Sequence, residues 1–166
     1  PEHVGVRAAG GVTTLEQVQA LVGAGAARVA TTDAAGVLAE LAALNGGGIY
    51  ADIGNNAPAR RLIVEDCLVT GNEATTGNGG GIFSYSVLEL RGAVVSNNTA
   101  TANSGGGVYL WASAAPSLWD DVTLVDNAAT NAGAVYLRAT PFRIDNSTFH
   151  TNVASSTGGA IRFEYY

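Results

Sequence analysis

The chain has 166 residues and contains no lysine, no methionine and a single cysteine, Cys67. Without lysine the chain has no amine nucleophile on a side chain, so Schiff-base chemistry is excluded. A single cysteine cannot form an internal disulfide bond, and we expect Cys67 to pack in the interior rather than act as a reactive thiol. Because the two histidines and this cysteine do not have zinc-site spacing, we expect no structural metal.

Charged residues are also scarce. They make up 13% of the chain, and 14 acidic residues against 8 arginines give a formal net charge of -6, so nucleic acid is not an expected partner. No apolar run reaches the roughly 18 residues of a membrane span, and no basic leader is present at the N-terminus. We therefore expect no membrane span and interpret the chain as a processed, excised or engineered soluble piece.

What the chain does contain falls into two regions that meet near Asn45. Residues 1–44 are rich in alanine and valine, whereas residues 45–166 are rich in glycine, asparagine, threonine and serine. The first region predicts a strand at 4–8 and another at 27–30, each followed by an amphipathic helix. We expect the second helix, over 33–44, to cap the domain formed by residues 45–166.

The first region resembles a known family through a GG-x-x-T turn and a G-A-x-R stretch. These motifs are similar to those in the last two strand-helix units of the deoxyribose-phosphate aldolase barrel. The resemblance implies that Arg7 occupies the position of the family's strand lysine and that Gly10 and Gly11 occupy its phosphate-binding glycine pair.

Two departures from this family determine which chemistry the first region can perform. The family's second phosphate turn falls on residues 30–33, where Ala30 adds a Cβ and Asp33 adds a negative charge. Together with the absence of lysine, these residues exclude aldolase activity, and they make the segment an aldolase-like remnant. A weak anion site at Arg7, Gly10 and Gly11 is the only binding role that we expect there; a capped structural helix is the alternative.

The second region repeats with a period near 26 residues. An aliphatic residue recurs after a glycine- or alanine-rich turn, with steps of 33, 26, 27 and 26. The aliphatic positions are Ile49, Ile82, Val108, Val135 and Ile161. A file of asparagines runs in parallel, at Asn72, Asn98, Asn127 and Asn152. Short strands at a fixed period, without a helix in each repeat, predict a solenoid whose coils bury their apolar side chains by stacking.

This repeat resembles the right-handed parallel β-helix proteins of the pectate-lyase-like superfamily, especially the GGGI repeats of secreted and outer-membrane surface proteins. The predicted fold is therefore mainly β, a right-handed parallel β-helix of about four and a half coils after an N-terminal βαβα segment. We expect the asparagines to hydrogen-bond along the axis and to adopt the left-handed backbone of a sharp corner. The resemblance implies a secreted or cell-surface parent protein.

The C-terminal end of the solenoid has no cap in the sequence. The chain stops at Phe163-Glu164-Tyr165-Tyr166, within a coil. A solenoid that ends in an open coil exposes its apolar cross-section. We therefore predict either an excised fragment or end-to-end self-association at this coil.

Strand alternation predicts an aromatic outer face on one sheet. If the aliphatic file points inward, the residues that follow it point to solvent. The predicted ligand-binding residues of this face are Phe83, Tyr85, Tyr109, Trp111, Tyr136 and Arg138. An exposed aromatic ladder can bind carbohydrate or a partner protein; the alternative is that the rings only stabilise their own sheet.

A second candidate site lies six to seven residues before the asparagines. Asp120 and Asp145 are predicted to lie one coil apart, with Arg91 in the preceding coil. Such carboxylates suit a polysaccharide lyase, a glycoside hydrolase or a calcium site, whereas a charge-balanced solvated row is the alternative. Our leading hypothesis is a non-catalytic binding or structural module, natural or engineered as a chimera. Enzymatic activity and a protein selected for folding alone are the other hypotheses.

Overall fold

The structure is a computed structural model that describes residues 7–9, 28–30, 46–51, 61–111, 115–139 and 141–165. The chain divides into two compact units, Pro1–Leu41 and Ala42–Tyr166. In the first unit, β1 (Arg7–Ala9) and β2 (Arg28–Ala30) pair in parallel, and they overlap the two predicted strands. The predicted helix over 33–44 and the glycines of the weak anion site lie outside the described residues.

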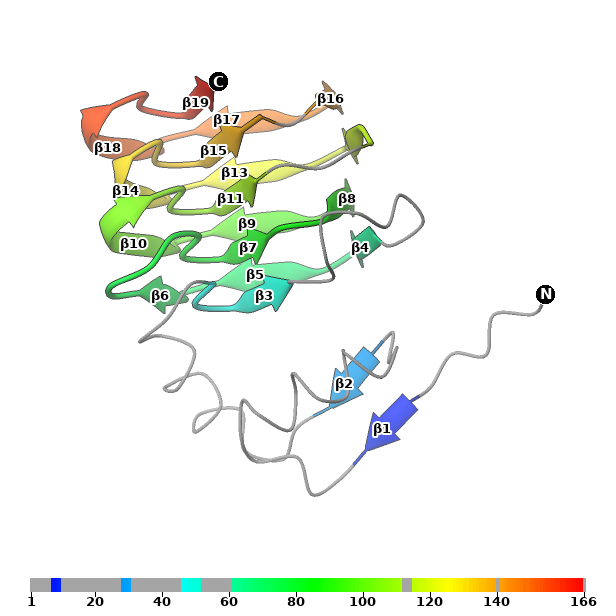
Figure 1. The fold of residues 1–166 in the computed structure, drawn as a ribbon. Helices are drawn as coiled ribbons and strands as arrows, with labels where there is room; N and C mark the ends of the chain where they lie inside the picture. The colour runs from blue at the N-terminus through cyan, green and yellow to red at the C-terminus, as the bar shows by residue number, and fades with distance from the viewer. Residues whose placement is uncertain are drawn as a thin grey trace. The chain divides into compact units, whose positions relative to one another are not determined.

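The second unit is a parallel β-solenoid of about four turns, which confirms the mainly β fold (Figure 1). A leading strand, β3 (Ile49–Ala51), precedes the first coil. The first coil contains β4 (Arg61–Glu65), β5 (Leu68–Thr70), β6 (Glu73–Ala74) and β7 (Ile82–Ser84). The second contains β8 (Val87–Arg91), β9 (Val94–Ser96), β10 (Thr99–Ser104) and β11 (Val108–Trp111). The third contains β12 (Ser117–Asp120), β13 (Thr123–Val125), β14 (Ala128–Asn131) and β15 (Val135–Arg138). The fourth contains β16 (Phe142–Asp145), β17 (Thr148–His150), β18 (Val153–Thr157) and β19 (Ile161–Glu164).

Equivalent strands of successive coils stack into four parallel sheets. Their orders are β3-β7-β11-β15-β19, β4-β8-β12-β16, β5-β9-β13-β17 and β6-β10-β14-β18. We call the first of these the aromatic sheet and the second the charged sheet. In the aromatic sheet Ile82, Val108 and Val135 are neighbours in register and fully buried, which confirms the predicted inward file. They belong to a core that also contains Leu88, Leu90 and Trp119.

The asparagine file forms a continuous hydrogen-bonded ladder inside one corner. Asn98 Oδ1 accepts hydrogen bonds from the backbone N–H of Asn72 at 3.0 Å and from its Nδ2 at 2.9 Å. Asn98 Nδ2 in turn donates to Asn127 Oδ1 at 3.0 Å and to the carbonyl oxygen of Val69 at 2.9 Å. The same pattern continues from Asn127 to Asn152. The predicted stacking of these side chains along the axis is therefore confirmed.

Left-handed backbone recurs at three corners in each coil and occurs once more at Ala139, after β15. At the ladder corner it is not where we predicted it. The residue with positive φ is the one that precedes each ladder asparagine. These residues are Gly71, Asn97, Asp126 and Thr151. The corner after each strand of the charged sheet has positive φ at Asp66, Gly92, Asp121 and Asn146. The corner before each strand of the aromatic sheet has positive φ at Gly46, Gly79, Gly105, Ala132 and Gly158. The preceding residue turns the chain, and the ladder asparagine is then free to point inward.

Cys67 differs from its prediction. Its side chain is exposed and donates to the carbonyl oxygen of Glu65 at 3.0 Å. The residue lies directly after the left-handed Asp66, where the chain turns between β4 and β5, so it is at the outside of a corner rather than in the core.

Candidate functional site

The rings of the aromatic sheet form a stack that follows the solenoid axis. Parallel pairing places Tyr50, Phe83, Tyr109 and Tyr136 in one file. Neighbouring ring centroids are 5.2, 5.1 and 5.0 Å apart, and the ring planes lie within 8° of parallel. This spacing follows the roughly 4.8 Å between hydrogen-bonded strands, so each ring covers a face of the next.

The prediction that this file faces solvent is wrong. Phe83 is 1% exposed, Tyr109 5% and Tyr136 6%, and together with Ala132 they form a second apolar cluster. Alternation correctly placed these rings on the outside of the backbone, but neighbouring rings in the stack cover their faces. The outer side of the aromatic sheet therefore carries its own buried layer of aromatic side chains.

A second file on the same sheet is half-buried and mixes aromatic with charged residues. Tyr85 lies edge-on to Phe83 at 4.8 Å, and its ring centroid is 5.2 Å from that of Trp111. The guanidinium carbon of Arg138 lies 4.3 Å from the centroid of the Trp111 ring. Trp111 is thus contacted by Tyr85 in the preceding coil and by Arg138 in the following one. The contact with Arg138 is a cation–π interaction.

The two files meet at the fourth coil through Glu164. The Tyr136 hydroxyl donates to Glu164 Oε2 at 2.6 Å, and Arg138 Nε lies 3.5 Å from the same oxygen. Burial, followed by the hydrogen bond to Glu164, raises the pKa of Tyr136 to about 12. Burial also raises the pKa of Tyr109, against a smaller opposing effect of Arg138. Both hydroxyls therefore remain protonated near neutral pH. Arg162 lies 5.6 Å from the Tyr136 ring centroid.

The predicted acidic site is assembled in register across the charged sheet. Glu65, Arg91, Asp120 and Asp145 are successive neighbours in four parallel strands. Arg143 Nε contacts Asp145 Oδ2 at 2.6 Å, and Asn146 Nδ2 donates to Asp120 Oδ1 at 2.9 Å. The structure therefore brings Arg91, Asp120 and Asp145 together, and it engages both aspartates in contacts with their neighbours.

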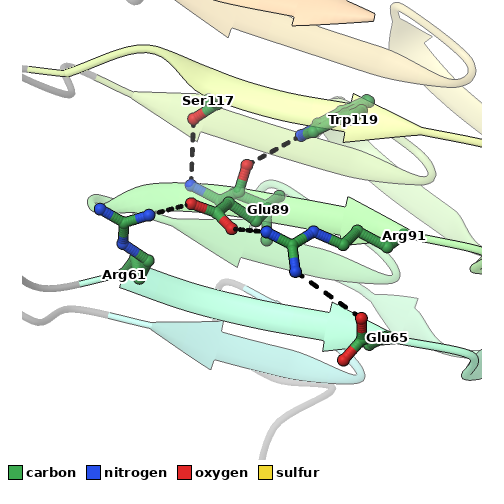
Figure 2. Close-up of polar contacts among 7 residues, drawn as sticks. Arg61, Glu65, Glu89, Arg91, Ser117 and Trp119 are labelled. Carbon is green, nitrogen blue, oxygen red and sulfur yellow. Dashed lines mark hydrogen bonds and ion pairs between the residues drawn. The ribbon is translucent and has the colours of Figure 1, made fainter. Parts of the chain in front are cut away.

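Sequence analysis missed the buried charge in this sheet, which is Glu89. Its side chain is 2% exposed, and Arg61 Nη1 and Arg91 Nη2 donate to its two carboxylate oxygens, the latter at 2.7 Å (Figure 2). Arg91 also lies 3.7 Å from Glu65. Glu89 therefore links β4 and β8 through two arginines, each about half-exposed.

Removing the arginines is expected to destabilise the fold more than removing the acid. In an Arg61→Ala/Arg91→Ala variant the carboxylate of Glu89 loses both partners, and we expect a loss of about 2 kcal/mol in the free energy of unfolding. In Glu89→Leu both guanidinium groups can return to water, and the new side chain packs between Ile63 and Leu118, so we expect a change below about 1 kcal/mol.

Urea denaturation at neutral pH measures both values, with Glu65→Gln as a control for an exposed partner of Arg91. A Glu89→Leu variant that is less stable than the double arginine variant would contradict this account of the cluster.

Within the described part of the chain, no cluster of three or more metal-ligating side chains is found, and no helix has the length and hydrophobicity for crossing a membrane. No protein-family model matches the chain, and neither a curated protein nor a solved structure matches it. The resemblances to the aldolase barrel and to pectate-lyase-like proteins therefore rest on their motifs alone.

Proposed function

We propose that the solenoid is a non-catalytic structural module. The observation that carries this proposal is that neighbouring side chains cover the faces of the aromatic rings. Phe83, Tyr109 and Tyr136 stack on one another, and Trp111 lies between Tyr85 and Arg138. A sugar that stacks on an aromatic side chain needs an open ring face. Rings stacked along the axis present their edges instead, so they support a role in holding the coils together.

The charged sheet supports the same proposal. A lyase or hydrolase needs a carboxylate or arginine that is available to substrate. Arg91 contacts Glu89, Asp145 contacts Arg143, and Asp120 accepts a hydrogen bond from Asn146. Charge balance within a solvated face explains these contacts without a substrate. Calcium binding and polysaccharide cleavage by Arg91, Asp120 and Asp145 are the competing proposals that the experiment below tests.

Recognition of a partner protein is a second candidate for the aromatic sheet. Tyr85, Trp111 and Arg138 are half-buried, and these residue types are enriched at the centres of protein interfaces. Because the Trp111 ring already contacts Tyr85 and Arg138, these side chains suit contact with a protein surface better than stacking on a sugar.

The origin of the module is part of the proposal. The glycine turns and the asparagine ladder support descent from a secreted or cell-surface β-helix protein, and residues 1–44 keep the aldolase-like motifs. We propose a natural or engineered chimera of these two sources, with no aldolase activity because the chain has no lysine.

The structural role is tested by comparing two apolar side chains on different sheets. Trp111→Ala is expected to lower the free energy of unfolding by about 2 kcal/mol, because it removes the contacts to Tyr85 and Arg138. Leu118→Ala, at a residue 47% exposed on the charged sheet, is expected to cost less than about 1 kcal/mol. Chemical denaturation gives both values.

Polysaccharide assays on the same proteins distinguish the competing functions. We expect no cleavage of uronate polymers, with or without calcium, and no binding to neutral or acidic glycans. Cleavage that is lost in Asp120→Ala and kept in Trp111→Ala would establish the enzyme instead. Glycan binding that is lost in Trp111→Ala, without a loss of stability, would establish a carbohydrate-binding face.

A further inference from the structure

Two asparagines of the solenoid occur in the pattern that accepts N-linked sugars, which is Asn-x-Ser/Thr without proline in the middle. One is Asn97, the first residue of an Asn-Asn-Thr sequence, and the other is Asn146, the first residue of an Asn-Ser-Thr sequence. Every other asparagine of the chain lacks serine or threonine two positions later. The pattern therefore singles out two positions in a chain that is rich in asparagine.

The structure places both of these asparagines at exposed corners. Asn97 lies between β9 and β10, Asn146 lies between β16 and β17, and both residues are exposed. Both have left-handed backbone, with φ of 53° and 49°. Each is the residue at which its coil turns, and its side chain lies on the outside of the solenoid. The sugar-accepting amide is thus available at both positions in the folded protein.

The ladder asparagines cannot take this role. Asn98, directly after Asn97, is fully buried, and its Nδ2 donates to the carbonyl oxygen of Val69 and to Asn127 Oδ1. Two positions after each ladder asparagine the chain has an alanine, at Ala74, Ala100, Ala129 and Ala154. The first three of these are buried, so the hydroxyl that the pattern requires is absent where the coil packs closely. The repeat therefore separates structural asparagines from acceptor asparagines.

The corner at Asn97 has room for a large substituent. The equivalent position in the preceding coil is Gly71, where an added Cβ would meet no atom within 4 Å. Within the described part of the chain, the side chain of Asn97 forms no hydrogen bond, so its Nδ2 keeps both hydrogens available.

The corner at Asn146 is more constrained but remains compatible with a sugar. Its Nδ2 donates to Asp120 Oδ1 at 2.9 Å. An N-linked sugar replaces one of the two amide hydrogens, and the remaining hydrogen can maintain this bond. The glycosylated side chain can therefore keep the conformation that the structure shows.

We propose that Asn97 and Asn146 are N-glycosylated when the chain enters a secretory compartment that contains an oligosaccharyltransferase. This inference rests on the secreted or cell-surface origin proposed above. In the reaction Nδ2 attacks C1 of an oligosaccharide that is joined to a lipid diphosphate. The Nδ2–C1 bond forms, the C1–O bond to the diphosphate breaks, the lipid diphosphate leaves, and one amide proton passes to a base of the transferase.

The two acceptors flank one sheet, the one with the order β5-β9-β13-β17. Asn97 follows β9, and Asn146 precedes β17. The outer side of this sheet carries Leu68, which is 65% exposed. Glycans at both ends of these strands would be bulky and solubilising, and they would shield this side of the solenoid. The described strands of the aromatic sheet contain no acceptor asparagine, so that sheet stays open to a partner protein.

Expression of the full chain in mammalian cells, with an added cleavable secretion signal, tests the proposal. We expect an intact mass that exceeds that of the chain by two oligosaccharides, and an amidase that removes N-linked glycans should abolish the excess. Asn97→Gln and Asn146→Gln should each lose one oligosaccharide, and the double variant should lose both. Asn103→Gln is the matched control, because Asn103 begins an Asn-Ser-Gly sequence outside the pattern, and its mass excess should equal that of the unmodified sequence.

Translation of the same chains in vitro with endoplasmic-reticulum microsomes detects the sugars without requiring secretion. A chain without sugar in both systems would overturn the proposal, and sugar on one asparagine alone would overturn the assignment of the other. Thermal unfolding before and after removal of the glycans should give midpoints within about 3 °C of each other. A larger loss of stability in the glycosylated protein would contradict the compatibility with the fold. The denaturation of the Trp111 and Leu118 variants tests the structural role separately, so failure of glycosylation would leave that proposal standing.

Discussion

Replacing Asn98 with alanine is expected to lower the free energy of unfolding by about 3 to 5 kcal/mol. The side chain is fully buried and takes part in four hydrogen bonds along the ladder. Its removal leaves the backbone N–H of Asn72 and the carbonyl oxygen of Val69 without their partners, and it opens a small cavity between coils. Each buried polar group without a partner costs about 1 to 3 kcal/mol.

The matched control is Asn152→Ala, which changes the same residue at the open end of the ladder. Asn152 has the same kinds of bonds, to Asn127 and to the carbonyl oxygen of Leu124, but it is half-buried, and β18, the strand that follows it, is the last of its sheet within the described residues. Water can replace part of its hydrogen bonding, so we expect less than half of the Asn98 effect. Urea denaturation, followed by circular dichroism and by tryptophan fluorescence, measures both. Equal losses would show that the ladder contributes no more inside the stack than at its end.

The inward file and the asparagine ladder could be predicted because the period alone determines them. In a solenoid, residues one repeat apart lie above one another, so Val108 over Ile82 and Asn98 over Asn72 follow from the alignment of the repeats. No knowledge of the solvent-facing side was required for either prediction.

The exposure of the outer rings could not be predicted in the same way. Alternation gives the side of the sheet on which Phe83 and Tyr109 lie, but their burial depends on the rings of the neighbouring coils. The repeat contained the necessary signal: aromatic residues in four successive coils, one strand spacing apart, are close enough to cover one another. The same spacing therefore argues against the solvent-exposed ladder that strand alternation predicted.

Glu89 was missed because an acid at an outward position is normally solvated. Its burial depends on Arg61, which is 28 residues away in the preceding coil, and on Arg91, two residues away in the same strand. Parallel pairing places Arg61 opposite Val87, four positions before the row that contains Glu65 and Arg91, so aligning the residues of that row did not reveal the shared carboxylate. A search for acids with one arginine two positions along the same strand and another in the preceding coil would have found it.

Substituting Gly106 with alanine is expected to cost about 3 kcal/mol or more. A Cβ at this position would lie 2.3 Å from the carbonyl oxygen of Ala128 and 2.4 Å from that of Gly133. Both are backbone atoms of the third coil, one in β14 and one in the turn before β15, so neither can move without displacing that coil. Glycine is present at the middle position of all five of these turns, whereas alanine occurs at the first position in Ala132 and at the third in Ala134. The repeat itself therefore identifies the middle glycine as the one required for close packing of the backbone.

The control for this prediction is Gly159→Ala, at the middle position of the fourth-coil turn. Here the nearest atom to a Cβ is the carbonyl oxygen of Asn152 at 3.9 Å, an ordinary van der Waals distance, and β18 and β19 are the last strands of their sheets in the part of the chain that the structure describes. Since alanine restricts the unfolded chain more than glycine does, we expect Gly159→Ala to be neutral or to stabilise by up to about 1 kcal/mol. Thermal and urea denaturation of the two variants therefore should give opposite signs for the same chemical change. A small loss in Gly106→Ala would mean that neighbouring coils can separate at low cost, and the close packing that we assign to this corner would then be wrong.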